Sequence, residues 1–198
     1  MKVIDNSQAL NELHTECKQC RACKLRGTAT QVVPGSGNPN ADILFIGEAP
    51  GKNEDIKGIP FCGAAGKLLD ELLESIKLNR EDIFITNTVK CRPPGNRDPE
   101  QEEIEACKHW LKSQVEIIKP KIIVTLGRYS MARYLPFAQI SKDHGKAYKK
   151  GDLIFFVLYH PAVGLYKGSM KEVLFQDMQK LDKILKGDYK EVNHASEV

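Results

Sequence analysis

Three polar residues of different chemistry each follow a short apolar segment of the sequence: Glu48, Asn87 and His160. The segment before each of them is typical of a strand that is buried on both faces of a sheet. The carboxyl ends of parallel strands meet at one edge of a sheet, where open α/β sheets bind ligands. The sequence therefore predicts that a carboxylate, an amide and an imidazole converge on one site. Taken singly, each residue also fits a plain role in a turn or as a structural histidine.

The cysteine spacing predicts a metal site. Cys20-x-x-Cys23 offers two closely spaced thiolates, and Cys91 and Cys107 supply a second pair. Four thiolates suit either zinc or an iron–sulfur cluster, and spacing does not distinguish the two. Cys17-x-x-Cys20 has the same spacing as Cys20-x-x-Cys23, so the choice between Cys17 and Cys23 stays open at this point. We interpret the site as structural, joining the N-terminal segment to the loop after Asn87.

The elements that must position these residues alternate along the chain. Apolar segments predict strands at 43–46, 83–86, 121–125 and 153–158. Apolar residues at three- and four-residue spacing predict helices at 6–16, 64–77, 98–118, 128–134 and 170–186. This alternation predicts an α/β fold, with three α/β/α layers and a central, mostly parallel four-stranded sheet.

Turn and cap residues predict where some of these elements begin. Ser7 is the expected N-cap of the first helix, and Asp98 that of the helix 98–118, with Pro99 in its first turn and Gln101 completing a capping pattern. The proline- and glycine-rich segment 24–41 is expected to be mostly irregular, and 55–63 to be a second loop.

Composition sets broad limits on the class of protein. The chain has 198 residues, 41% of them hydrophobic, which is enough for one core and one domain. The sequence has neither a secretory signal pattern nor an apolar run long enough to cross a membrane, so we expect a soluble, intracellular protein. In that compartment, six cysteines favour metal or redox chemistry over disulfides. A net charge of +3 permits a nucleic-acid partner without arguing for one.

Four ordered motifs, together with the cysteines, resemble family 4 uracil-DNA glycosylases, the iron–sulfur members of their superfamily. The motifs are Gly47-Glu48-Ala49-Pro50-Gly51 with Glu54-Asp55, Gly58-Ile-Pro60-Phe61-Cys62-Gly63-Ala-Ala-Gly66-Lys-Leu-Leu69, Thr86-Asn87-Thr-Val-Lys90-Cys91-Arg92-Pro93-Pro94, and His160-Pro161-Ala162. The resemblance extends from about Cys20 to the last predicted helix. It implies one glycosylase domain over 1–198, with 187–198 as a loosely ordered tail.

The resemblance implies a structural [4Fe–4S] cluster. The frame Cys20-Arg-Ala-Cys23-Lys-Leu fits the family pattern, so the ligands it implies are Cys20, Cys23, Cys91 and Cys107, with Cys17 as the spare. Family members usually carry valine where this chain has Cys62, which supports a packing role for that residue.

The implied activity is that of a monofunctional DNA repair glycosylase, which hydrolyses the N-glycosidic bond of flipped-out uracil and leaves an abasic site. Asn87 would read the edge of uracil and Phe61 would lie against its ring. His160 would act as a neutral donor to uracil O2, helped by backbone groups around Gly47, Glu48 and Ala49.

The nucleophilic water has no obvious general base, because alanine occupies position 49, where relatives outside this family carry aspartate. We expect backbone carbonyl groups and Glu48 to orient the water. Glu54 would crowd C5 of the base and reject thymine; simple solvation of the loop is the alternative for Glu54 and Asp55.

Contacts with DNA and with other partners are the last implied features. Leu165 is the expected wedge into the base stack, with Val163 as a competitor. Phosphate contacts are expected from Lys167, Lys171, Arg92 and Arg97. The substrate would be uracil-containing DNA, single- or double-stranded. We expect a monomer without a membrane partner, in the cytoplasm of a prokaryote and on the nucleoid when bound to DNA, with a sliding clamp as a further partner to test.

Two other functions fit the same residues. One is a non-catalytic module that uses the pocket to bind uracil-DNA or single strands. The other is a zinc-stapled α/β enzyme that acts on a free nucleotide.

Overall fold

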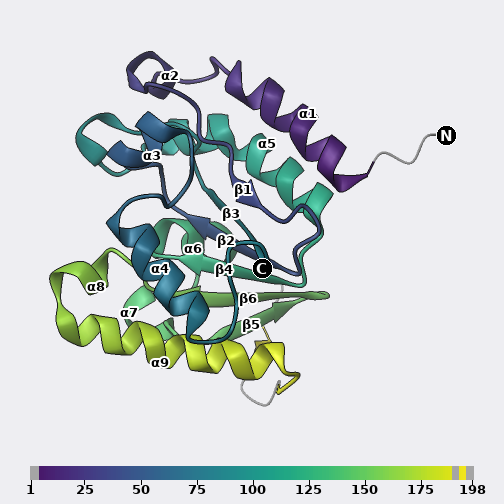
Figure 1. Ribbon diagram of the computed structural model, residues 1–198, viewed down its shortest axis with the longest axis vertical. Coiled ribbons are helices and arrows are strands. Elements are labelled where there is room, and N and C mark those ends of the chain that lie inside the picture. Colours follow the sequence, from purple (N-terminus) through teal and green to yellow (C-terminus); the bar gives the residue numbers. More distant parts are fainter. Residues whose placement is uncertain (1–4, 189–191, 195–198) are drawn as a thin grey trace.

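The computed structural model describes residues 5–188 and 192–194. Four parallel strands form the middle of its sheet: β3 (Ile83–Asn87), β2 (Ile43–Gly47), β4 (Ile122–Leu126) and β6 (Leu153–Leu158), side by side in that order (Figure 1). Gly47 pairs with Asn87 in the register of β2 and β3, so these two strands end together. The predicted α/β architecture with a mostly parallel sheet is confirmed.

The sheet is wider than predicted, with seven strands in the described part of the chain. On one edge, β1 (Ser36–Gly37) pairs antiparallel with β3. On the other, β5 (Ala147–Lys150) pairs antiparallel with β6, and β7 (Val192–His194) pairs with β5. Part of the predicted loose tail is therefore a strand; 189–191 and 195–198 lie outside the described residues.

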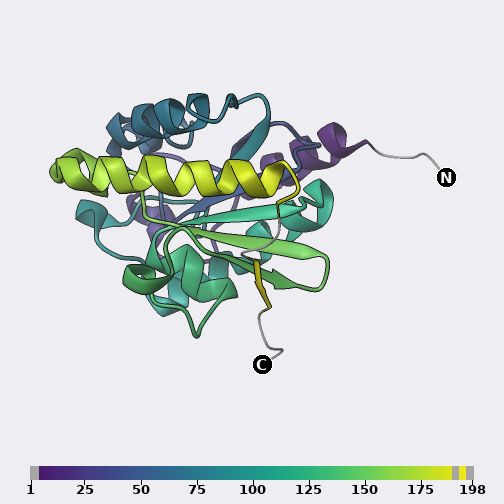
Figure 2. The same ribbon diagram turned by 90° about the horizontal axis from the view of Figure 1, so that it is seen from below.

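Helices cover both faces of the sheet. On one face α4 (Ala64–Glu74) and α9 (Gly168–Leu185) pack on Phe45, Ile85 and Phe156. On the other, the apolar residues of α1 (Asn6–Lys18), α5 (Gln101–Ile118) and α6 (Arg128–Tyr134) cluster with those of the strands. Figure 2 shows α4 and α9 together on one side and α6 on the opposite side.

Several predicted boundaries are wrong in detail. Asp5, and not Ser7, caps α1, because its Oδ1 accepts the backbone N–H of Gln8 at 2.9 Å. Glu100, and not Asp98, caps α5, where Glu100 and Glu103 form a reciprocal capping box.

Short helices also interrupt segments that were predicted to be irregular or were left without an element. They are α2 (Leu25–Thr28), α3 (Lys52–Lys57), the 3₁₀ turn η1 (Pro94–Asn96), α7 (Ile140–Asp143) and α8 (Val163–Tyr166). Among the described helices, none has the length and apolar character needed to cross a membrane.

Candidate active site and cysteine cavity

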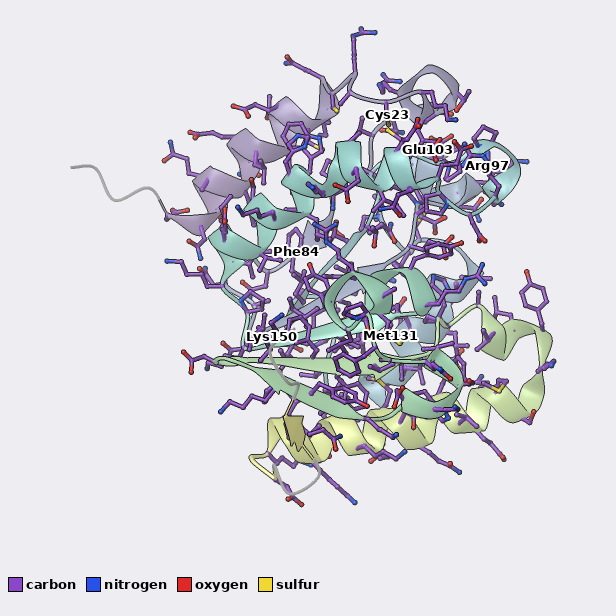
Figure 3. All side chains as sticks on the ribbon, turned by 180° about the vertical axis from the view of Figure 1, so that it is seen from behind. Cys23, Phe84, Arg97, Glu103, Met131 and Lys150 are labelled. Carbon is purple, nitrogen blue, oxygen red and sulfur yellow. The ribbon has the colours of Figure 1, made fainter. Side chains whose placement is uncertain are left out.

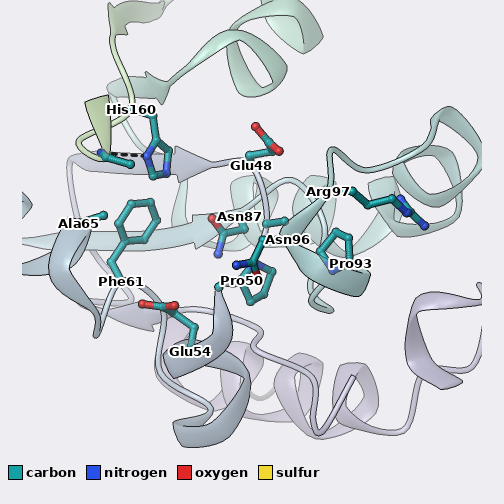
Figure 4. Close-up of a pocket in the computed structure, with 13 residues that line it drawn as sticks. Glu48, Pro50, Glu54, Phe61, Ala65, Asn87, Pro93, Asn96, Arg97 and His160 are labelled. Atoms are coloured by element: carbon teal, nitrogen blue, oxygen red, sulfur yellow. Dashed lines mark hydrogen bonds between the residues drawn. The ribbon is translucent and has the colours of Figure 1, made fainter. Parts of the chain in front are cut away.

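A cavity of about 310 Å³ opens where β2, β3 and β6 end (Figure 4). Glu48 follows β2, Asn87 is the last residue of β3, and His160 comes shortly after β6. The structure thus brings the three predicted polar residues into the wall of one cavity. The rest of the wall consists of Ala49, Pro50, Gly51, Glu54, Phe61, Ala65, Pro93, Asn96, Arg97 and Ala162.

The side chain of Asn87 is buried, with only 1% of the residue exposed. Its Oδ1 has no hydrogen-bond partner among the residues that the structure describes. Its backbone is fixed, since Lys90 Nζ donates to the Asn87 carbonyl at 2.8 Å. A buried acceptor without a partner is costly, so this amide presents an acceptor for an N–H group of a ligand.

Gly47 keeps the space around that amide free. A Cβ at this position would lie 2.3 Å from Asn87 Oδ1 and 2.6 Å from the ring of Phe61. Any side chain here would therefore collide with the wall of the cavity, and the glycine is required by space.

The imidazole of His160 is neutral for two separate reasons. Burial lowers its pKa to about 4, although Glu54 nearby raises it. Its Nδ1 accepts the backbone N–H of Ala162 at 3.2 Å, so the single proton of the neutral ring is on Nε2. The structure thus provides the tautomer, which the sequence alone does not.

Phe61 lies beside the imidazole of His160, with ring centroids 5.5 Å apart and an angle of 28° between the planes. Its backbone has φ 50°, a left-handed conformation that is unusual for an aromatic residue. Arg80 stabilises this turn, because its Nη2 donates to the Phe61 carbonyl at 2.6 Å and its Nη1 to the Pro60 carbonyl at 3.1 Å. The aromatic face is thus held in place from outside the cavity.

Glu54 and Asp55 are adjacent but have different surroundings. Glu54 lines the cavity, and its Oε1 accepts the backbone N–H of Gly63 at 2.8 Å. Asp55 points elsewhere: it is 3% exposed and accepts the N–H and hydroxyl of Thr30 at 2.9 and 2.7 Å. Only Glu54 is therefore placed to contact a ligand, whereas Asp55 links α3 to the segment that contains Thr30.

The carboxyl group of Glu48 has a strongly shifted pKa. Burial raises the pKa to about 7; the charge of Asp98 also raises it, and that of Arg128 lowers it. Arg128 is ion-paired with Asp98. With a pKa of about 7, the charge of Glu48 depends on pH near neutrality; burial is the main cause, and Asp98 and Arg128 act on the pKa in opposite directions.

Of the residues predicted to contact DNA, one lies in the wall of the cavity. Arg97 lines it, but its guanidinium is paired with buried Glu103 at 2.6 and 2.9 Å (Figure 3). Arg92 Nε donates to Asn96 Oδ1 at 2.6 Å. Leu165, in α8, is 47% exposed, and Lys167 after it is also exposed. Lys171 Nζ is paired with Glu71 at 2.7 Å. Binding of DNA by these residues stays a prediction.

Two residues that shape this site, Arg80 and Asn96, were not predicted from the sequence. Arg80 was missed because its targets are backbone carbonyls, which leave no pattern in the sequence. Asn96 was missed because it lies inside the proline-rich loop; its left-handed φ of 57° fits the preference of asparagine for that conformation.

Five cysteines line a second, smaller cavity between α1, α2, α5 and the segment after β3. It encloses about 320 Å³ of empty space, against about 840 Å³ for the first cavity counted in the same way, with open solvent at the mouth included in both. The cysteines are Cys17, Cys20, Cys23, Cys91 and Cys107, and the rest of the wall is Ala22, Leu25, Arg26, Val32, Lys90, Ala106 and Trp110. Cys62 lies elsewhere and is partly exposed.

The donor set of this cavity fits a thiolate-bound cluster. In the described ranges, 5–188 and 192–194, no three histidine, cysteine, aspartate or glutamate side chains are grouped so that they could hold a single metal ion. A cluster differs from a single ion because each thiolate binds a separate iron atom. Burial raises the pKa of Cys17 and of Cys91 to about 12, and positive charge lowers it, from Lys90 at Cys17 and from Arg26 at Cys91. Free thiolates are therefore disfavoured in this cavity, and a bound cation would have to offset that cost.

The sequence matches a known protein family and several curated relatives over most of its length. The family model of the uracil DNA glycosylase superfamily matches residues 34–181. A type-4 uracil-DNA glycosylase of Sulfurisphaera tokodaii is 48% identical over 184 residues, which cover 87% of this chain and 83% of that protein. Similar proteins of the same name are 47% identical in Archaeoglobus fulgidus, over 89% of this chain and 94% of the relative, and 40% identical in Thermotoga maritima, over 85% and 91%.

Proposed function

Because the chain belongs to the uracil DNA glycosylase superfamily and to its type-4 group, we propose that it hydrolyses the N-glycosidic bond of uracil in DNA and leaves an abasic site, without a lyase step. We assign this activity to one domain spanning 1–198. The observation that carries the proposal is the buried, unpartnered amide oxygen of Asn87, which lines the same cavity as His160 and Phe61.

Asn87 is the residue that would distinguish uracil from cytosine. Its Oδ1 would accept from uracil N3–H, and its Nδ2 would donate to O4, once the base is turned out of the helix. Cytosine presents the opposite donor and acceptor at these two atoms. Each unsatisfied buried group costs about 1–3 kcal/mol, so the amide rejects cytosine by a mismatch at two atoms. Glu54, fixed by the N–H of Gly63, would reject thymine by crowding its methyl group.

His160 would stabilise the leaving group. Cleavage leaves negative charge on uracil, largely at O2, and positive charge on the sugar. With Nδ1 occupied by the Ala162 N–H, the proton on Nε2 is free to be donated to O2. The charged form of the ring has a pKa of about 4, so the ring is neutral near pH 7 and has no extra proton to transfer. It therefore acts by donating a hydrogen bond that stabilises the leaving group, and not as a general acid.

Glu48 would orient the water that attacks the sugar. Its position in the cavity wall, next to Ala49, supports this role because no aspartate is available there. The ionised carboxylate would also face the positive charge that develops on the sugar. The expected order of contributions is leaving-group stabilisation first and water orientation second.

The cysteine cavity would hold a [4Fe–4S] cluster through Cys20, Cys23, Cys91 and Cys107, and Cys17 would be the spare thiol. When bound, the cluster supplies structural cross-linking and no step of the hydrolysis. Its ligands would tie the segment between α1 and α2 to α5 and to the loop after β3, which carries Pro93, Asn96 and Arg97 into the wall of the base pocket.

DNA would be held by the rim of the base pocket, with Leu165 inserted into the base stack. Lys167, Lys171, Arg92 and Arg97 would contact phosphates. We propose that the protein acts as a monomer on single- or double-stranded uracil-DNA; binding of a sliding clamp is a further part of this proposal.

The test is incubation with an oligonucleotide that contains one uracil, followed by alkali, which breaks the strand only at an abasic site. Asn87→Ala should lower kcat/KM by at least about 30-fold, since loss of two hydrogen bonds removes about 2 kcal/mol or more. Asn79→Ala, at an exposed asparagine, is the matched control and should be unchanged. Retention of uracil-DNA without any cleavage would instead indicate a binding module. Release of uracil from a free nucleotide alone would indicate the nucleotide enzyme.

A further inference from the structure

The single tryptophan of the chain lies in the wall of the cysteine cavity. Trp110 is in α5, one helical turn after Cys107. Its ring packs against His109, with centroids 4.3 Å apart. Its Nε1 is buried and has no hydrogen-bond partner among the residues that the structure describes. Buried tryptophan N–H groups usually have a partner, so this one calls for an acceptor.

The wall of the cavity limits what that acceptor can be. Its side chains come from cysteine, alanine, leucine, valine, arginine, lysine and tryptophan, so the acceptor atoms they contribute are the cysteine sulfurs. Two other residues of the wall have donors that are already in use, and Arg26 Nη1 donates to the Ala29 carbonyl at 3.2 Å. The backbone N–H of Lys90 donates to Cys107 Sγ at 3.3 Å, and its Nζ donates to Thr86, Asn87 and Gln114. The indole N–H is thus a buried donor without a partner, in a wall whose side-chain acceptors are sulfur atoms.

We propose that Trp110 donates a hydrogen bond from Nε1 to a sulfur of the iron–sulfur cluster, either a cysteine thiolate or an inorganic sulfide. This inference rests on the cluster proposed above. Hydrogen bonds to cluster sulfurs raise the reduction potential, because they stabilise the extra negative charge of the reduced state. Trp110 is thus a positioning residue that acts through the cluster, and it takes no part in hydrolysis.

The experiment is resonance Raman spectroscopy of the iron–sulfur stretching modes of the purified, cluster-containing protein in H₂O and in D₂O, combined with measurement of the midpoint potential. In the wild type, D₂O should shift the modes through both the indole N–H and the Lys90 N–H. In Trp110→Phe the shift should shrink to the part that the remaining donors contribute, the Lys90 N–H among them, and the potential should become more negative. Val32→Ala removes packing from the same wall without removing a donor, so it should keep the wild-type shift and potential.

A second variant guards against loss of the cluster from Trp110→Phe. Because the chain has one tryptophan, benzothienylalanine supplied in its place exchanges the indole N–H for sulfur and preserves the ring shape. It should reproduce the smaller D₂O shift. If the variants contain the cluster and show the wild-type D₂O shift and potential, the role of Trp110 is overturned, whereas the proposed cluster is not. If wild-type protein that is purified anaerobically is found to contain neither iron nor sulfide, the proposed cofactor is overturned, and this inference with it.

Discussion

The protonation state of Glu48 should control the rate of uracil release near neutral pH. Burial and Asp98 raise the pKa of this carboxyl group to about 7, against the lowering effect of Arg128. The role proposed for Glu48, orienting water and facing a cationic sugar, needs the ionised form. That form is lost as pH falls through the pKa. We therefore expect kcat/KM to be level above about pH 7 and to fall below it.

The size of this effect follows from the pKa. Each pH unit below it reduces the ionised fraction about tenfold, so kcat/KM should be about 100-fold lower at about pH 5 than at its plateau. His160 adds no inflection in this range, because its pKa of about 4 keeps it neutral throughout. The acid limb should therefore have a slope of one and report a single group.

The neighbours of Glu48 provide the test of the physical reasoning. Asp98→Asn removes the charge that raises the pKa and should move the inflection to lower pH, whereas Arg128→Gln should move it to higher pH. In Glu48→Gln the inflection should disappear. Single-turnover cleavage of a uracil oligonucleotide across the pH range measures all four proteins. The same inflection in Glu48→Gln, or a shift in one direction for both neighbours, would refute the assignment.

Three further predictions concern the walls of the two cavities. Gly47→Ala places a Cβ 2.3 Å from the side-chain oxygen of Asn87. Overpacking should lower the unfolding free energy by about 1–3 kcal/mol, which thermal unfolding measures. The same change should lower kcat/KM about tenfold or more in the oligonucleotide assay. Arg80→Gln removes the hydrogen bonds to the Phe61 turn and should lower the unfolding free energy by about 1–3 kcal/mol. Its control, Asp70→Asn, breaks only the exposed ion pair with Arg80 and should cost less than about 1 kcal/mol. Equal losses of the two variants in urea titration would contradict this. Cys107→Ser should lose iron and visible absorbance and lower the thermal midpoint, while Cys62→Ser keeps both, as iron analysis and calorimetry would show.

The central strands were predictable from sequence because burial on both faces leaves a continuous apolar run, as in Ile43–Gly47. The hairpin strand β5 was not, because half of it is exposed: Lys149 and Lys150 face solvent, and its pairing depends on β6 beside it. The start of α5 was misplaced for a local reason. Proline and aspartate both suggested a start at 98, but the reciprocal bonds of Glu100 and Glu103 fix it two residues later.

The site residues were predictable where chemistry and strand ends coincide. Glu48, Asn87 and His160 follow three strands, so parallel topology alone is enough to bring them together. The different fates of Glu54 and Asp55 were not predictable. They depend on which side of α3 faces the cavity and which faces Thr30, and a helix this short has no apolar periodicity that would show its orientation.

Lys90 connects the two cavities physically. It is fully buried, and its ammonium group donates to the carbonyl of Asn87 at 2.8 Å and to Gln114 Oε1 at 2.7 Å, while its backbone N–H donates to Cys107 Sγ. Burial lowers its pKa to about 8, and the neighbouring cysteine sulfurs, when charged, raise it. The negative charge of cluster ligands would therefore hold this lysine in its charged form. The carbonyl that it binds is the backbone carbonyl of Asn87, the residue whose side-chain amide is proposed to read uracil. The proposed cluster would therefore support base recognition through the backbone of that residue, without touching the base.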